Sequence, residues 1–126
     1  MKVIISTPNA PEAIGAYSQA VKANGFLFLS GQIPINPKTN QIEVVDITAQ
    51  TKQVIENIKA ILESEGLTLK DIVKASIFLA DLADFKRVNE IYASYFTSEP
   101  PARSTFAVAG LPKGSKIEIE VVAVLG

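Results

Sequence analysis

Arg103 is the residue best suited to bind a small substrate. It begins a predicted strand directly after two prolines and an alanine at 100–102. Because proline restricts the backbone before it, the guanidinium is held at the start of a rigid strand. Its planar fork can donate two parallel hydrogen bonds to a carboxylate. A solvated surface arginine, or a structural salt bridge to Glu118 or Glu120, is the alternative interpretation.

Glu118 and Glu120 are the candidate acid/base residues. They lie two positions apart on one predicted strand, so their side chains share a face and are about 7 Å apart. If that face is covered, at least one carboxyl can acquire a shifted pKa and perform general acid/base work. The alternatives are a solvated strand face or an intersubunit salt bridge with Lys116.

Three further positions are weaker candidates for a binding site. Ser30 and Gly31 end a predicted strand, where a glycine lets a ligand approach the backbone, although simple strand termination explains them as well. Tyr17 precedes that strand pair and can offer a phenol to a pocket, or act as a packing residue. Asn89 is a polar residue among apolar neighbours in a predicted helix. The aromatic residue Tyr92 in the same helix is interpreted as core.

The composition excludes whole classes of chemistry. The 126 residues contain no cysteine and no histidine. Cysteine nucleophiles, zinc-finger sites and Ser-His-Asp triads are therefore excluded, and any catalysis must use carboxylates, tyrosine, lysine, arginine, hydroxyl groups, the backbone and water. The net charge is −1, and no basic run exceeds two residues. This pattern argues against a nucleic-acid partner.

The length predicts one domain over residues 1–126. The first nine residues lack the apolar core of a signal peptide, and no stretch approaches the roughly 20 apolar residues of a membrane span. We therefore expect a cytoplasmic protein with no membrane partner.

Two segments have the apolar period of a helix, Ile47–Glu65 and Leu82–Phe96. Asp46 is the expected N-cap of the first helix, and Gly66 is its expected left-handed C-terminal cap. Asp81 is the expected N-cap of the second helix, with Asp84 completing a capping box.

Strand signals occupy most of the remaining chain. Asn24-Gly25 predicts a tight hairpin turn within residues 19–30. The other expected strands are a short edge strand at Ile4 and Ile5, one strand over 72–79, and a final pair over 103–109 and 116–124. The order β-β-β-α-β-α-β-β predicts an α+β fold with a mixed sheet and both helices on one face.

The last strand predicts what lies on each face of this sheet. Ile117, Ile119, Val121 and Ala123 should pack beneath the helices, since alternate residues share a face. The opposite face is half apolar and should include Ile72 and Phe78 of the strand expected over 72–79. We expect a second copy of the chain to cover it.

Several blocks of the chain together resemble the Rid family, also called the YjgF or translation-inhibitor endoribonuclease-like family, and most of all its RidA branch. They are Asn9–Pro11, Ile14–Tyr17, Ser30–Pro34, Asn36–Thr39, Gly66-Leu67, Pro101–Ser104, Phe106, Leu111-Pro112 and Ile117–Ile119.

The resemblance implies a chorismate-mutase-like homotrimer with a central barrel of strands and sites between subunits. It implies hydrolysis of the imine forms of 2-aminoacrylate and 2-aminocrotonate to 2-keto acids and ammonia. Because imine hydrolysis is already facile, we expect neither a metal nor a cofactor. By this similarity Arg103 binds the substrate carboxylate, and Glu118 activates water. The remaining substrate-binding residues implied are Tyr17, Ser30, Gly31, Asn89 and Thr105.

One position departs from many RidA-like proteins, in which a cysteine follows the arginine by two residues; here it is Thr105. A role for the thiol itself cannot be transferred to this chain, whereas a role for the backbone can. Two other functions compete with deamination. They are a non-catalytic trimer that binds 2-keto acids, and an endoribonuclease or translation inhibitor, which the charge pattern disfavours.

Overall fold

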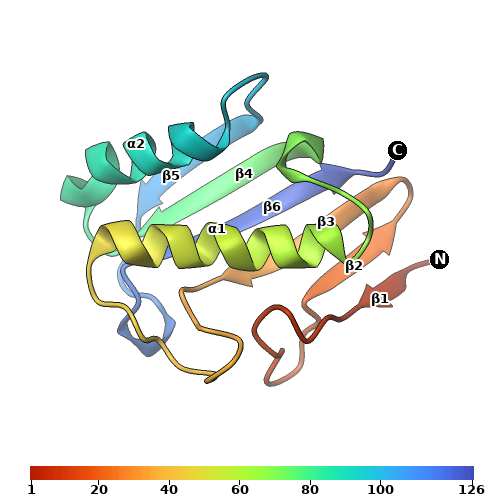
Figure 1. Ribbon diagram of the computed structural model, residues 1–126, viewed down its shortest axis with the longest axis horizontal. Helices are drawn as coiled ribbons and strands as arrows, with labels where there is room; N and C mark the ends of the chain where they lie inside the picture. Colours follow the sequence, from red (N-terminus) through yellow and green to blue (C-terminus); the bar gives the residue numbers. More distant parts are fainter.

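The computed structural model describes residues 1–126, and Figure 1 shows one sheet with both helices packed on the same face. The sheet has six strands in the order β1-β2-β3-β6-β4-β5. Their bounds are β1 Val3–Ile5, β2 Ala20–Ala23, β3 Phe26–Gln32, β4 Ile72–Leu79, β5 Ala102–Ala107 and β6 Ile117–Val124. The helices are α1 Ile47–Glu63 and α2 Phe85–Tyr95, with short 3-10 helices η1 Leu69–Asp71, η2 Leu82–Asp84 and η3 Pro112–Gly114. The predicted element order and fold class are confirmed.

The β2–β3 hairpin turns where the sequence predicted. Asn24 and Gly25 have φ angles of 51° and 85°, and Ala23 pairs with Phe26 directly across the turn. Positive φ at both central residues gives a two-residue turn whose twist matches that of the strands.

The caps of α1 are also confirmed. The Asp46 carboxylate accepts a hydrogen bond from the Ala49 amide at 2.8 Å, and Gly66 is left-handed, with φ +72°. The helix ends at Glu63, two residues before the predicted end. The reason is that the amides of Glu65 and Gly66 donate to carbonyls three residues back, which tightens the final turn.

The start of α2 differs from the prediction. Asp81 caps the 3-10 turn η2 by accepting from the Ala83 amide at 2.9 Å, and the α-helix begins only at Phe85. Asp84 makes no side-chain capping bond, so the predicted capping box is wrong. The tighter 3-10 turn takes the place of the first α-helical turn that such a box requires.

The last two strands do not pair with each other, and this part of the prediction is wrong. Strand β5 pairs only with β4, in parallel, and β6 lies between β3 and β4, antiparallel to both. Strands joined by a crossover helix run parallel, and α2 is that crossover between β4 and β5. The side of β6 that faces the helices is wholly apolar. A central position in the sheet buries this side most completely, which favours placing β6 there.

The core lies between the sheet and the helices. Ile117, Ile119, Val121 and Ala123 of β6 are buried there, as predicted. Ile72 was expected on the opposite face but is only 4% exposed. A register shift between Ile72 and Lys74 inserts Val73 as an extra residue in β4, which turns Ile72 toward the core.

The face of the sheet opposite the helices, here called the open face, carries exposed apolar side chains. They include Phe26, Phe28, Phe106 and Val124. Phe78, which pairs with Glu118, lies on this face as expected. Its cover by a second copy remains a prediction. None of the helices is long and apolar enough to cross a membrane.

Two buried amides on α1 hold the loops that flank β3 and β6. Asn57 donates to the carbonyl oxygens of Ile33 and Ile35 at 3.3 and 2.9 Å. Gln50 accepts from the Lys116 amide at 2.9 Å and donates to the Val44 carbonyl at 3.1 Å. Helix α1 therefore fixes chain segments that lie far apart in the sequence.

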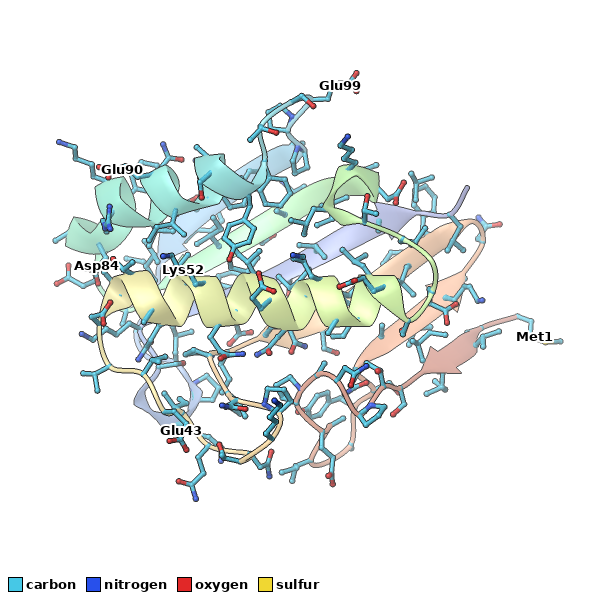
Figure 2. All side chains as sticks on the ribbon, viewed as in Figure 1. Met1, Glu43, Lys52, Asp84, Glu90 and Glu99 are labelled. Atoms are coloured by element: carbon cyan, nitrogen blue, oxygen red, sulfur yellow. The ribbon has the colours of Figure 1, made fainter.

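We expect Asn57→Ala to lower the free energy of unfolding by about 2–3 kcal/mol, because two carbonyl groups lose their buried donor. Urea denaturation measures this loss. Lys52→Ala, at an exposed position of the same helix (Figure 2), is the control and should change stability by less than about 0.5 kcal/mol. Equal stability of the two variants would contradict the anchoring role.

Candidate functional site

The largest hollow of the chain surrounds Glu118. This Glu118 cleft has a volume of about 650 Å³ and is formed by the loop before β2, the end of β3, the segment at η3 and the outer face of β6. Its polar lining includes four predicted site residues, and these are Tyr17, Ser30, Gly31 and Glu118. Tertiary structure thus brings together residues that lie about a hundred positions apart in the sequence, such as Tyr17 and Glu118.

A bulge at the end of β3 places the backbone of Gly31 beneath Glu118. Leu29 pairs with Val121 and Gln32 with Ile119, so β3 contains one more residue than β6 over this interval. A Cβ at position 31 would collide with the Glu118 carboxylate. A larger residue at this position would therefore displace the Glu118 carboxylate from the main chain, so Gly31 does more than terminate the strand.

The environment of Glu118 favours its protonated form. Partial burial raises the pKa of Glu118, and the negative charge of Glu120 on the same strand raises it further. A raised pKa brings a carboxyl closer to neutrality, where it can both accept and return a proton. Of the two carboxylates considered from the sequence, Glu118 is therefore the better acid/base group.

Buried Gln19, which the sequence analysis did not single out, holds the wall of the cleft. Its side chain accepts from the Thr7 amide and donates to the carbonyls of Thr7, Ala10 and Pro11. Nearby, Ser30 donates its hydroxyl hydrogen to the Ser18 carbonyl at 2.6 Å. These bonds fasten the loop that carries Tyr17, whose ring remains exposed. A single glutamine before a strand gives no sequence signal of this role.

Arg103 lies in a second, smaller hollow beside α2. This Arg103 pocket, of about 390 Å³, is lined by Asn89, Tyr92, Ala93, Phe96, Pro100, Pro101 and Arg103. The Arg103 Nη1 atom donates to Asn89 Oδ1 at 2.8 Å, and the guanidinium carbon lies 4.8 Å from the centre of the Tyr92 ring. Burial raises the pKa of Tyr92, and the Arg103 charge partly opposes that rise.

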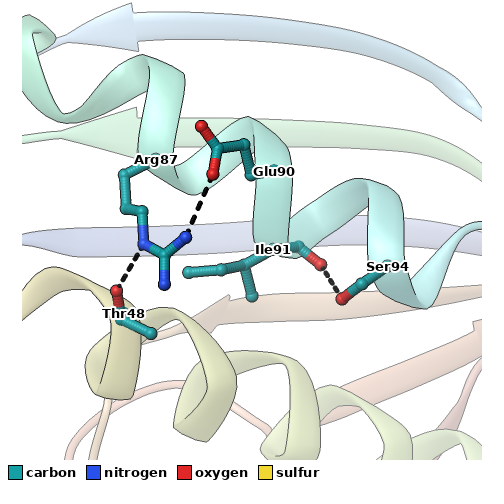
Figure 3. Close-up of polar contacts among 5 residues, drawn as sticks. All are labelled: Thr48, Arg87, Glu90, Ile91 and Ser94. Carbon is teal, nitrogen blue, oxygen red and sulfur yellow. Dashed lines mark hydrogen bonds and ion pairs between the residues drawn. The ribbon is translucent and has the colours of Figure 1, made fainter.

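The two arginines of the chain have different surroundings. Arg87 bridges the helices by donating to Thr48 Oγ1 at 2.8 Å and to Glu90 Oε2 at 3.0 Å (Figure 3). Arg103 belongs to none of the three ion pairs in the structure. The proposed salt bridge from Arg103 to Glu118 or Glu120 is therefore absent within the chain. Its uncompensated charge can attract an anion.

Arg103 and Glu118 lie on opposite faces of the sheet. Arg103 pairs with the buried Ala75 and contacts α2, so it is on the helix face. Glu118 alternates with the buried Ile117 and Ile119 and is on the open face. Strand β4 also separates β5 from β6, which places them about 10 Å apart within the sheet. A single chain therefore keeps the Glu118 cleft and the Arg103 pocket apart, and they are here called the two candidate half-sites.

Thr105 follows Arg103 on the helix face of β5 and pairs with Ile77. It lines neither hollow, and its hydroxyl oxygen is buried without a hydrogen-bond partner. The structure thus brings Tyr17, Ser30 and Gly31 to Glu118, and Asn89 to Arg103. Thr105 is left beside Arg103 with no side-chain partner of its own.

Comparison with known proteins assigns the chain to a family. The family model described as Endoribonuclease L-PSP matches residues 7–125. The chain belongs to this family, the Rid family. A Rid family protein from Yersinia pestis has a crystal structure that superposes with a TM-score of 0.97 at 51% identity, covering 99% of this chain and 100% of that one.

Two relatives from Escherichia coli relate the Rid fold to small molecules. The 2-iminobutanoate/2-iminopropanoate deaminase of strain K12 is 49% identical over 98% of both chains. The crystal structure of TdcF with bound serine has a TM-score of 0.93 at 43% identity, covering 98% of this chain and 99% of that one.

We expect Glu120→Gln to lower the pKa of Glu118, because the substitution removes the neighbouring negative charge that disfavours ionisation. The carboxyl pKa can be followed by ¹³C NMR as a function of pH. In the variant, a larger fraction of Glu118 should be ionised at any pH near the midpoint of its titration. The increase in pKa that is caused by burial should remain.

Glu43→Gln is the matched control, because Glu43 projects from a loop at the edge of the molecule (Figure 2) and does not line the Glu118 cleft. It should leave the Glu118 titration unchanged. An unaltered midpoint in Glu120→Gln would show that the two carboxylates are not coupled.

Proposed function

We propose that the chain is a hydrolytic deaminase that converts reactive enamine and imine acids to 2-keto acids and ammonia. The substrates are 2-aminoacrylate, 2-aminocrotonate and their 2-imino tautomers. The observation that carries the proposal is the Glu118 carboxyl, which lies against the Gly31 backbone with a raised pKa in an open cleft. The E. coli deaminase, at 49% identity, supports the same substrate class.

In the proposed reaction Arg103 binds the substrate carboxylate through its fork of N–H groups. Glu118 takes a proton from a water molecule as the water oxygen bonds to the imine carbon, and the C=N electron pair moves to nitrogen. Glu118 then returns the proton to the nitrogen of the carbinolamine. The hydroxyl proton of the carbinolamine then passes through Glu118 to the same nitrogen while the hydroxyl oxygen forms the C=O bond, so the C–N bond breaks and ammonia leaves.

The separation of the half-sites supports a site built from two copies of the chain. In a 2-imino acid the carboxylate is bonded directly to the reacting carbon, so Arg103 and Glu118 must act on neighbouring atoms. They cannot do so from opposite faces of one sheet. We propose a homotrimer in which the Arg103 pocket of one copy meets the Glu118 cleft of the next, because a head-to-tail interface of this kind closes into a ring.

Arg103→Ala and Glu118→Gln test the chemistry. Substrate is generated by a coupled serine or threonine dehydratase, and ammonia release is compared with the uncatalysed rate. Loss of Arg103 should reduce kcat/KM about 100-fold, since it removes a charge-assisted contact. Loss of the Glu118 base should reduce kcat at least 100-fold. Arg87→Ala and Glu43→Gln are the controls and should remain active.

Unchanged rates in both site variants would exclude this mechanism. Tight binding of 2-ketobutyrate by wild-type protein, without any rate enhancement, would favour the alternative of a non-catalytic 2-keto acid sensor. Ribonuclease activity that survives both Arg103→Ala and stringent purification would favour the nuclease alternative.

Mixed assemblies test whether the two residues come from different copies. The inactive Arg103→Ala and Glu118→Gln chains are denatured, mixed in equal amounts and refolded together. In a random trimer about a quarter of the sites then join an intact Arg103 to an intact Glu118, so roughly that fraction of activity should return. Each variant refolded alone is the control. No recovery from a mixture that has formed mixed trimers would contradict the shared site.

A further inference from the structure

The half-buried Arg103 side chain packs against one face of α2. Phe85, Asn89 and Tyr92 follow one another at the i, i+4 and i+7 positions, which align on a single face of a helix. The guanidinium carbon lies 5.7 Å from the Phe85 ring centre and 4.8 Å from the Tyr92 ring centre, and Asn89 accepts from Nη1. We call these three residues the α2 clamp.

We propose that the α2 clamp is a positioning device that orients Arg103 for the substrate carboxylate. This inference rests on the proposed function. It assigns Asn89 to the arginine and not to the substrate, and it gives a functional role to Tyr92, which the sequence analysis assigned to the core.

The contacts of the clamp explain how it can act. An aromatic face within about 6 Å attracts a guanidinium without using any of its N–H donors. Asn89 uses one of the five donors, so the remaining edge of the fork stays free for an anion. A carboxylate in place of Asn89 would neutralise the charge and compete with the substrate. A neutral acceptor and two aromatic rings hold the arginine and leave its charge available.

The ring of Tyr92, and not its hydroxyl, is the part that acts. The side chain is only 5% exposed, and its hydroxyl oxygen has no hydrogen-bond partner. The ring is supported from behind by Phe96, with centroids 4.2 Å apart and planes tilted by 21°. A stacked pair of rings is a rigid surface for the guanidinium. Tyr92→Phe should therefore preserve the clamp, whereas Tyr92→Leu should remove the aromatic ring on which the guanidinium lies.

The test is the dissociation constant of 2-ketobutyrate, measured by calorimetry on the intact assembly. Tyr92→Leu and Asn89→Ala should each weaken binding about five- to tenfold and raise KM with a smaller change in kcat. Tyr92→Phe should stay within twofold of wild type. Val88→Ala, at a fully buried position of α2 outside the clamp, is the control for lost stability and should also bind normally.

A second readout follows the arginine directly. The chain has only two arginines, so the Nε–Hε signals of Arg87 and Arg103 are easily distinguished by ¹⁵N NMR. The Arg103 signal should be shifted by the Tyr92 ring and should move in Tyr92→Leu but not in Val88→Ala. The Arg87 signal, fixed by Thr48 and Glu90 (Figure 3), should stay in place.

The outcomes separate the two proposals. If Tyr92→Leu and Asn89→Ala bind 2-ketobutyrate like wild type while Arg103→Ala does not, the clamp is wrong and the proposed function stands. If Arg103→Ala itself binds normally, the carboxylate site of the proposed function is wrong. If Tyr92→Phe weakens 2-ketobutyrate binding as much as Tyr92→Leu does, the Tyr92 hydroxyl is the group that matters. The proposal that the ring positions Arg103 is then wrong.

Discussion

Successive side chains of a strand point to opposite faces of its sheet, and the rest of this structure depends on that constraint. In β6 it sends Ile117 and Ile119 beneath the helices and Glu118 to the open face. In β5 it sends Arg103 toward α2. The apolar pattern that builds the core therefore also separates the only arginine without an acidic partner from the carboxyl with the raised pKa. The proposed reaction therefore requires at least two copies of the chain, one to supply Arg103 and one to supply Glu118.

Each half-site is supported by a different local device. The Glu118 half depends on a bulge, since one extra residue in β3 brings the Gly31 backbone beneath the carboxylate and limits its access to water. The Arg103 half depends on helical spacing, since Asn89 and Tyr92 reach the guanidinium from one face of α2. Neither device needs histidine, cysteine or another group that titrates near neutrality.

The edge position of β5 connects these two halves to the proposed assembly. Because β6 takes the centre of the sheet, β5 pairs on one side only and Arg103 lies near the boundary of the molecule. The open face beside Glu118 carries exposed phenylalanines, which a neighbouring copy would bury. Apolar contact and a shared site would then form together.

The sequence by itself determined the local elements, because hairpin turns, helix caps and apolar periods depend on neighbours along the chain. Asn24-Gly25, Asp46 and strand β4 follow the prediction. The family blocks contain the candidate site residues Tyr17, Ser30, Gly31, Arg103 and Glu118, but not Asn89 or Thr105. Only the tertiary structure decided that β6 separates β3 from β4 and that Ile72 is buried. It also decided that Gln19 bonds the Thr7 backbone and that Tyr92 lies against Arg103. Strand order, bulges and contacts between helix and sheet join residues that are distant in the sequence. These contacts stabilise the chain only once the sheet and the helices have packed together.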